Sequence, residues 1–145
     1  MFHLLEYAKS FIGLPYRWGG DDPIEGMDCS GLVQEILASV GMDPPGDQTA
    51  QKLYDHFSLH GKIGVYGEEL VGALAFFGPD NKHISHVAFC IDQYRMIEAG
   101  GGGSQTKTRE DAAKQNAFVR VRLVSNRKDL VAIIKPSYIK IGRVW

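Results

Sequence analysis

The chain of 145 residues is poor in cysteine, and it has no long apolar run. Its two cysteines, Cys29 and Cys90, are too few for a disulfide framework, and no Cys/His spacing resembles a zinc site. No segment is apolar over the roughly 20 residues that a membrane-spanning helix needs. Residues 1–6 lack the basic region and long apolar stretch of a signal peptide. We therefore expect no structural metal and no membrane span.

Strong charge of either sign is also missing. The 16 basic and 17 acidic residues leave a net charge of −1, which indicates neither nucleic acid nor an anionic membrane as a partner. The apolar share of 44% is ordinary for a globular protein, and the length suits one domain over residues 1–145. There are no internal repeats and no linker, and the sequence leaves the oligomeric state open.

Hydrophobic periodicity predicts helices in the first part of the chain and strands in the second. This order favours an α+β fold with a mainly antiparallel sheet. The expected helices span residues 2–12, 29–40 and 49–57, with one or two helical turns over 108–115. The expected strands span residues 73–77, 85–92, 96–99, 117–124 and 130–134, with an edge strand over 138–145.

Cys29 lies at the predicted start of the second helix. Asp28 is a favourable N-cap residue directly before it, which places Cys29 in the first helical turn. The positive end of the helix dipole stabilises a thiolate there, and the free N–H groups can hold the oxyanion of an attacked carbonyl. The alternative is that Cys29 is a small buried apolar residue. The helix has one apolar stripe, formed by Leu32, Val33, Ile36 and Leu37.

The strand over 85–92 supplies a histidine. Alternation places Val87, Phe89 and Ile91 toward the core and His86 on the opposite face, directed at the helix start. A short hairpin then places Glu98 on the neighbouring strand. Together with Cys29 these residues would form a triad in which the imidazole takes the thiol proton and the carboxylate fixes the ring tautomer. A nearby negative charge also raises the pKa of a histidine.

Other residues offer alternatives to this triad, and both His86 and Glu98 can equally be non-catalytic strand residues. His83 is a rival base in a turn, and Cys90 is a rival nucleophile in the middle of a strand. His56 and His60 are four residues apart, but without a third ligand nearby we interpret them as surface residues. The run of glycines at 100–103 lacks the Lys-Ser/Thr of a phosphate loop. We predict no metal and no cofactor.

The loop over residues 14–23 contains three large side chains, Tyr16, Arg17 and Trp18. They can cover the core, or they can form the walls of a binding cleft, which is where loop aromatics often serve.

Four strings of the sequence together resemble the NlpC/P60 cysteine peptidases. They are GLPYRWGG at 13–20, DCSGLV at 28–33, SHVAF at 85–89 and MIEA at 96–99, and the resemblance covers residues 4 to about 124. It implies a papain-like fold in which N-terminal helices pack on an antiparallel half-barrel sheet. It also implies hydrolysis of amide bonds in the peptidoglycan stem peptides of bacterial cell walls, often between D-glutamate and a diamino acid.

The resemblance implies a role for each matching residue. Cys29 would be the nucleophile, His86 the general base and then acid, and Glu98 the third member of the triad, a position that is often histidine in the family. Gly72-Ala73-Leu74 is a further departure, because the family usually has Gly-Asp-Leu there.

The resemblance also implies a binding surface around the nucleophile. Tyr16 would support the oxyanion, and Asp28 and Ser30 would receive the amine end of a stem peptide. Trp18 is a candidate for substrate binding as one of the loop aromatics that can line a cleft.

Two other functions stay open. One is acyl transfer or amidase chemistry on another substrate by the same thiol, although such relatives usually have histidine before cysteine. The other is a structural or assembly protein that keeps the fold without turnover. A catalytic domain of this size fits a phage-encoded lysin or tail protein, which we favour, a delivered effector or an intracellular recycling enzyme. The expected location is accordingly cytoplasmic, phage-associated or the cell wall reached by another route.

Overall fold

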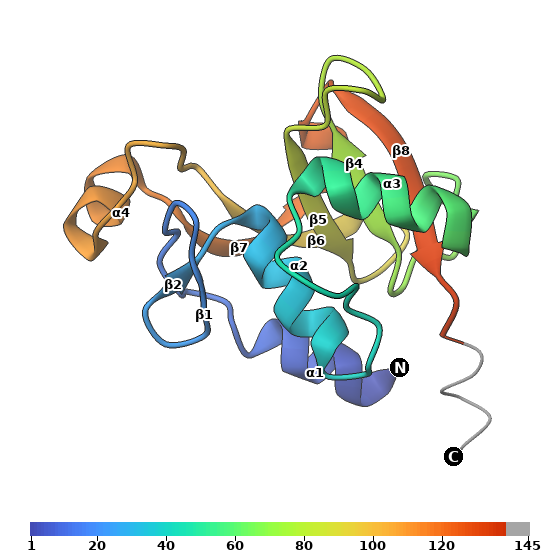
Figure 1. Ribbon diagram of the computed structural model, residues 1–145, viewed down its shortest axis with the longest axis horizontal. Coiled ribbons are helices and arrows are strands. Elements are labelled where there is room, and N and C mark those ends of the chain that lie inside the picture. The colour runs from blue at the N-terminus through green and yellow to red at the C-terminus, as the bar shows by residue number, and fades with distance from the viewer. Residues whose placement is uncertain (139–145) are drawn as a thin grey trace.

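A computed structural model describes residues 1–138 of the chain (Figure 1). The predicted edge strand over 138–145 falls outside this part except for Tyr138, which lies in a turn. The helices are α1 (Phe2–Lys9), α2 (Cys29–Ala38), α3 (Ala50–His60) and α4 (Arg109–Gln115), with a 3-10 turn η1 (Val124–Asn126). The strands are β1 (Asp21–Asp22), β2 (Gly26–Met27), β3 (Gly61–Ile63), β4 (Leu74–Phe77), β5 (His86–Cys90), β6 (Arg95–Gly100), β7 (Phe118–Leu123) and β8 (Leu130–Pro136).

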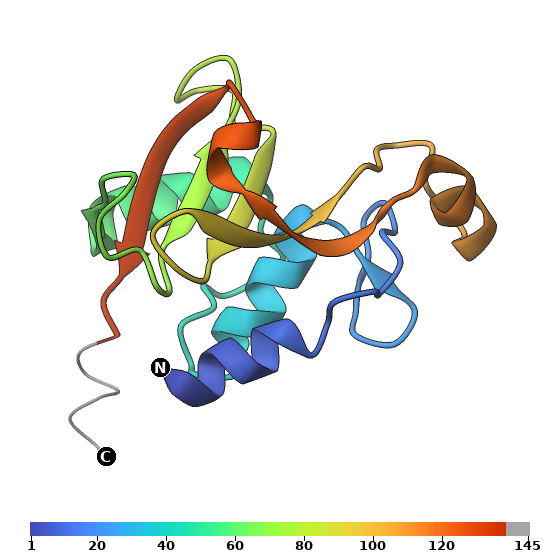
Figure 2. The same ribbon diagram turned by 180° about the vertical axis from the view of Figure 1, so that it is seen from behind.

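Six strands form one antiparallel sheet in the order β3-β8-β4-β5-β6-β7. Helices α2 and α3 lie in front of this sheet in Figure 1, and Figure 2 shows the opposite face of the sheet, on which no long helix of residues 1–138 packs. The β6–β7 hairpin reaches away from the body of the sheet and ends at α4, close to the small β1–β2 sheet. The predicted α+β class with an antiparallel sheet is confirmed.

The main core lies between α2 and the sheet. The predicted apolar stripe of α2 is fully buried and packs against side chains of β4, β5 and β6, among them Phe76, Phe89 and Ile97. Burial of this kind contributes about 1.5–3 kcal/mol for each large aliphatic side chain. The packing therefore fixes the start of α2, with Cys29, close to the beginning of β5.

The opposite face of the sheet is buried as well, so the expectation of a core on one face of β5 is wrong. Ala88 and Cys90 belong to a second apolar cluster with Phe77 and Met96. Other members come from segments that fold over this face, since Leu70 precedes β4 and Val124 begins η1, the orange-red turn in Figure 2. The alternation of residues within β5 cannot show that segments distant in the sequence pack on its second face.

Three strands were not predicted, because two or three residues are too few to show alternation. Strands β1 and β2 form a small hairpin inside the loop before α2, and β3 pairs with β8 at the sheet edge. Isolated bridges join Tyr16 to Met27 and Pro15 to Phe118. The loop is therefore held at both ends rather than free. Within residues 1–138, no helix combines the length and apolar character needed to cross a bilayer.

Substitution of Ile36 tests the packing of α2 on the sheet. Ile36 is completely buried, so Ile36→Ala should lower the free energy of unfolding by about 2–5 kcal/mol. Ile24 is 71% exposed, and Ile24→Ala should change it by less than about 0.5 kcal/mol. Urea unfolding followed by circular dichroism measures both. Equal stabilities of the two variants would contradict this account of the core.

Candidate active site

Cys29 is the first residue of α2, and three hydrogen bonds to Asp28 hold the segment around it. Asp28 Oδ1 accepts from the backbone N–H of Gly31 at 2.8 Å and from the Ser30 hydroxyl at 3.2 Å. Asp28 Oδ2 accepts from the backbone N–H of Gly19 at 3.2 Å, which fastens the preceding loop to the helix start. The predicted N-cap is confirmed. Cys29 therefore lies in the first turn of α2, where the backbone N–H groups have no acceptor within the helix.

His86 and Glu98 meet at the same end of the sheet. His86 is the first residue of β5, and its Nε2 lies 2.7 Å from Glu98 Oε1 on the neighbouring strand β6. Glu98 is completely buried and His86 is 8% exposed. An ionised carboxylate only accepts hydrogen bonds, so the proton of this bond belongs to Nε2. The neutral ring then presents an unprotonated Nδ1 to other partners.

The side chains of Cys29 and Glu98 are two groups that act on the charge of the His86 ring. Burial of the imidazole opposes its positive charge, but the interactions of the ring with the Cys29 and Glu98 side chains, and the negative charge on both, outweigh burial. Together they raise the pKa of His86 to about 9. The arrangement therefore favours an imidazolium ring at neutral pH.

Arg122 is a member of this cluster that the sequence analysis missed. Its Nη1 donates to Glu98 Oε2 at 2.9 Å from strand β7. Burial alone would raise the pKa of Glu98, but His86 and Arg122 together hold it below its usual range. The alternation of Arg120 and Arg122 along β7 was visible in the sequence, but nothing in it showed which of the two contacts Glu98.

Tyr16 lies beside Cys29, and Trp18 lies on the surface. Burial raises the pKa of the Tyr16 phenol, and the negative charges of Cys29 and Asp28 raise it further, so the hydroxyl keeps its proton. Gly102 packs against the Tyr16 ring so closely that a Cβ there would lie 2.3 Å from a ring carbon. Trp18 is 54% exposed, and its backbone N–H donates to the Thr106 carbonyl at 2.7 Å.

The rival residues occupy unsuitable positions. Cys90 is completely buried in β5, where burial raises the pKa of its thiol to about 12. His83 lies in an exposed turn, where its Nδ1 is 2.7 Å from Asp80. The rings of His56 and His60 in α3 lie with their centroids 4.7 Å apart and are tilted by 39° to each other. Among the described residues there is no group of three or more His, Cys, Asp or Glu side chains that could hold a metal ion.

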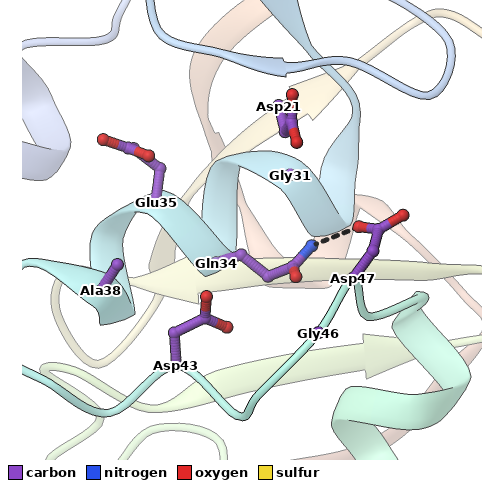
Figure 3. Close-up of a pocket in the computed structure, with 8 residues that line it drawn as sticks. All are labelled: Asp21, Gly31, Gln34, Glu35, Ala38, Asp43, Gly46 and Asp47. Atoms are coloured by element: carbon purple, nitrogen blue, oxygen red, sulfur yellow. Dashed lines mark hydrogen bonds between the residues drawn. The ribbon is translucent and has the colours of Figure 1, made fainter.

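A cavity of about 230 Å³ lies along the flank of α2 (Figure 3). Gln34 of α2 donates to the Gln48 carbonyl and accepts from the Gln48 N–H, which ties the segment after α2 to the helix. The carboxylates that line the cavity belong to Asp21, Glu35, Asp43 and Asp47. None of the residues Cys29, His86 and Glu98 lines it. The cavity is therefore a neighbour of the cysteine–histidine site and not part of it.

Together these features define an α+β domain in which a cysteine at a helix start faces a histidine of an antiparallel sheet. The chain belongs to the NlpC/P60 family, whose sequence model matches residues 13–123. It is 36% identical over 106 residues to a protein of Bacillus subtilis (strain 168) named bifunctional muramidase/DL-endopeptidase CwlT, and this match covers 70% of the chain and 30% of the relative. It is 31% identical over 118 residues to the peptidoglycan endopeptidase RipB of Mycobacterium tuberculosis, covering 71% of the chain and 44% of RipB.

Solved structures agree with this assignment. The crystal structure of the NlpC/p60 domain of the peptidoglycan hydrolase SagA matches with a TM-score of 0.66 and 26% identity, over 91% of this chain and 95% of that one. The structure of RipB from Mycobacterium tuberculosis matches with a TM-score of 0.65 and 26% identity, over 92% of this chain and 64% of that one. The chain spans less than half the length of the curated relatives named above.

Substitution of Gly102 tests its contact with Tyr16. A Cβ at Gly102 overlaps three atoms of the Tyr16 ring, so Gly102→Ala should displace the ring or the glycine segment and cost about 1–3 kcal/mol of stability. The neighbouring Gly103 has no atom within 4 Å of such a Cβ, and Gly103→Ala should stay within about 0.5 kcal/mol. Thermal unfolding compares the two variants. A Gly102→Ala protein as stable as Gly103→Ala would contradict the contact.

Substitution of Glu98 tests its effect on His86. Glu98→Gln removes the buried negative charge, so the pKa of His86 should fall from about 9 by about 1–2 pH units. Titration of the His86 ring nitrogens by ¹⁵N NMR measures this change directly. Glu68→Gln removes an exposed carboxylate and is the matched control, which should leave the titration unchanged. A His86 titration that is the same in both variants would show that Glu98 does not act on the ring.

Proposed function

We propose that this domain hydrolyses the amide bond between D-glutamate and the diamino acid of peptidoglycan stem peptides, through Cys29, His86 and Glu98. One observation carries the proposal: Cys29 stands at a helix start within reach of a buried histidine whose Nε2 is held by a carboxylate. Membership of the NlpC/P60 family supports it. So do the names of relatives such as the gamma-D-glutamyl-L-lysine dipeptidyl-peptidase of Bacillus cereus, 36% identical over 99 residues.

In the first half of the proposed reaction the Cys29 thiolate attacks the carbonyl carbon of the substrate amide. The carbon–nitrogen bond then breaks as the His86 imidazolium gives its proton to the leaving amine. The product is a thioester on Cys29 and a neutral imidazole. Glu98 accepts from Nε2 throughout, so Nδ1 is the nitrogen that exchanges the proton.

In the second half water attacks the thioester. His86, now neutral, takes a proton from this water, and the carbon–sulfur bond breaks to release the carboxylic acid. The thiolate and the imidazolium are restored together. Because both halves need the same ring nitrogen, the fixed tautomer that Glu98 imposes serves both.

Two donors can stabilise the oxyanion of each tetrahedral intermediate. The N–H of Cys29 belongs to the first helical residue and has no acceptor within α2. The Tyr16 phenol keeps its proton beside Cys29 and can donate as well. Loss of one oxyanion donor typically costs 10²–10³ in kcat.

The substrate would lie across the helix start. Trp18 is exposed and directly precedes Gly19, whose N–H donates to Asp28 at the helix start, so its ring is available to a substrate. Ser30 and Asp28 lie beside Cys29, and although Asp28 already accepts three internal hydrogen bonds, a carboxylate has about four lone-pair positions, so it can still receive an amine. A phage origin stays a prediction, because no feature of residues 1–138 bears on it.

Replacement of the nucleophile tests the proposal. Cys29→Ala should abolish release of new fragments from purified cell walls, and Cys90→Ala should keep most of the activity because Cys90 is buried away from the site. Mass spectrometry of the fragments identifies the bond that is cut. In water enriched in ¹⁸O, hydrolysis labels the new carboxylate, whereas acyl transfer to an amine does not.

Three results would count against the proposal. The first is undiminished cleavage by Cys29→Ala, which would exclude the thiol mechanism. The second is a product without the ¹⁸O label, which would indicate acyl transfer. The third is the absence of cleavage by the wild-type protein on every wall tested, which would favour a structural role.

A further inference from the structure

We propose that Arg122 is a positioning residue of the active site: its guanidinium keeps the Glu98 carboxylate ionised and aimed at His86, and so maintains the reactive state of Cys29. The proposal rests on the proposed function for its catalytic consequence. The effect of Arg122 on the ionisation of Glu98 concerns only groups within this chain and can be measured without a substrate.

The geometry singles out Arg122 among the arginines of β7. Arg120 is the residue directly opposite Glu98 in the β6–β7 register, and Arg122 is opposite Met96. Arg120 nevertheless turns to the backbone and donates to the carbonyls of Gly100 and Asn116. Arg122 alone of the two reaches the carboxylate, at 2.9 Å, across the diagonal of the ladder.

The two oxygens of Glu98 have different partners. Oε1 accepts from His86 at 2.7 Å, and Oε2 accepts from Arg122. With both oxygens bonded, the carboxylate cannot rotate away from the ring without breaking a charge-assisted hydrogen bond. A fully buried carboxylate also needs a compensating charge, since an ion without one takes up a proton instead.

A protonated Glu98 would undo the arrangement around His86. A carboxylic acid carries no charge to stabilise an imidazolium, and its O–H can donate to Nε2, which would reverse the tautomer of the ring. His86 would then present an N–H to Cys29 without holding the positive charge that pairs with a thiolate. The guanidinium of Arg122 is always charged and opposes this protonation of Glu98.

The direction of the effect follows from the charges around the triad. The charged and titratable groups there are Cys29, His86, Tyr16, Asp28, the two arginines of β7 and the Arg127–Asp129 pair. The pKa of Asp129 is lowered chiefly by Arg127 and further by the charge of His86. Removal of a cation raises the pKa of each nearby acid, so loss of Arg122 should move the titration of Glu98 to higher pH. Loss of Glu98 itself removes an anion beside His86 and should therefore lower the pKa of that histidine. Unfolding would return both titrations to their ordinary values, so the dispersion of the NMR spectrum must first show that each variant is folded.

The experiment compares Arg122→Gln and Arg122→Lys with wild type. The Glu98 carboxyl, followed by ¹³C NMR and assigned by its absence in Glu98→Gln, should titrate about 1–2 pH units higher in Arg122→Gln. Arg122→Lys keeps a cation at the same place and should restore at least half of that difference. Arg95→Gln removes an exposed arginine of β6 paired with Asp92 and is the matched control, which should leave the titration unchanged.

Reactivity gives a second measurement. The rate of alkylation of Cys29 by iodoacetamide at mildly acidic pH should fall in Arg122→Gln, because a protonated Glu98 no longer supports the positive charge of His86 beside the thiol. The acidic limb of kcat/KM should move by the same amount as the Glu98 titration, which lowers the rate below that limb about tenfold for each pH unit.

Each outcome decides one of the two claims. An unchanged Glu98 titration in Arg122→Gln overturns the role of Arg122, even when Cys29→Ala abolishes cleavage. A shifted titration in a protein that cleaves no stem peptide supports the role of Arg122 and contradicts the proposed function. A wild-type Glu98 that titrates at or above the ordinary range for glutamate overturns the role of Arg122 by itself, whether or not the variants fold.

Discussion

The packing of α2 against the sheet is the constraint on which the rest of this structure depends. Four apolar side chains of one helical stripe are buried on strands β4 to β6, and this contact fixes both the position and the direction of the helix. A helix held in this way has its positive end at a defined point of the sheet. Cys29 occupies that end, and His86 begins the strand that meets it. The position of Cys29 relative to His86 therefore depends on the apolar packing of α2, several residues further along the helix.

The second feature on which the site depends is the row of charged side chains formed by His86, Glu98 and Arg122. Glu98 has no solvent to stabilise it, so its ionised form depends on His86 at one oxygen and Arg122 at the other. The family often has a neutral residue type, histidine, in the position of Glu98. A carboxylate there provides a stronger pull on the imidazole proton, but it introduces a buried anion that must be balanced. The second arginine of β7 meets that requirement in this chain.

Much of the fold was predictable, because its long elements have clear periodicity. The stripe of α2, the N-cap at Asp28 and the alternation around His86 predicted the two elements that carry the cysteine and the histidine, and the pairing of β5 with β6 then brings Glu98 to His86. The second buried face of β5 was not predictable, because Leu70 and Val124 cover it from distant segments. The contact between Arg122 and Glu98 was not predictable either. The register between β6 and β7 places Arg120 opposite Glu98, and only the side-chain conformations show that Arg122 makes the contact. Tyr16 and Ser30 were selected by resemblance and Trp18 as a loop aromatic, and their roles in binding stay predictions.

The central claim is that the substrate becomes attached to the sulfur of Cys29 during turnover. The most direct measurement is acid quenching of the protein during hydrolysis of a stem peptide, followed by mass spectrometry of its proteolytic fragments. The account predicts a mass increase equal to the acyl part of the substrate on the fragment that contains Cys29, and its disappearance when the substrate is exhausted. Turnover with no acyl group on this fragment, or with the acyl group on another residue, would contradict it.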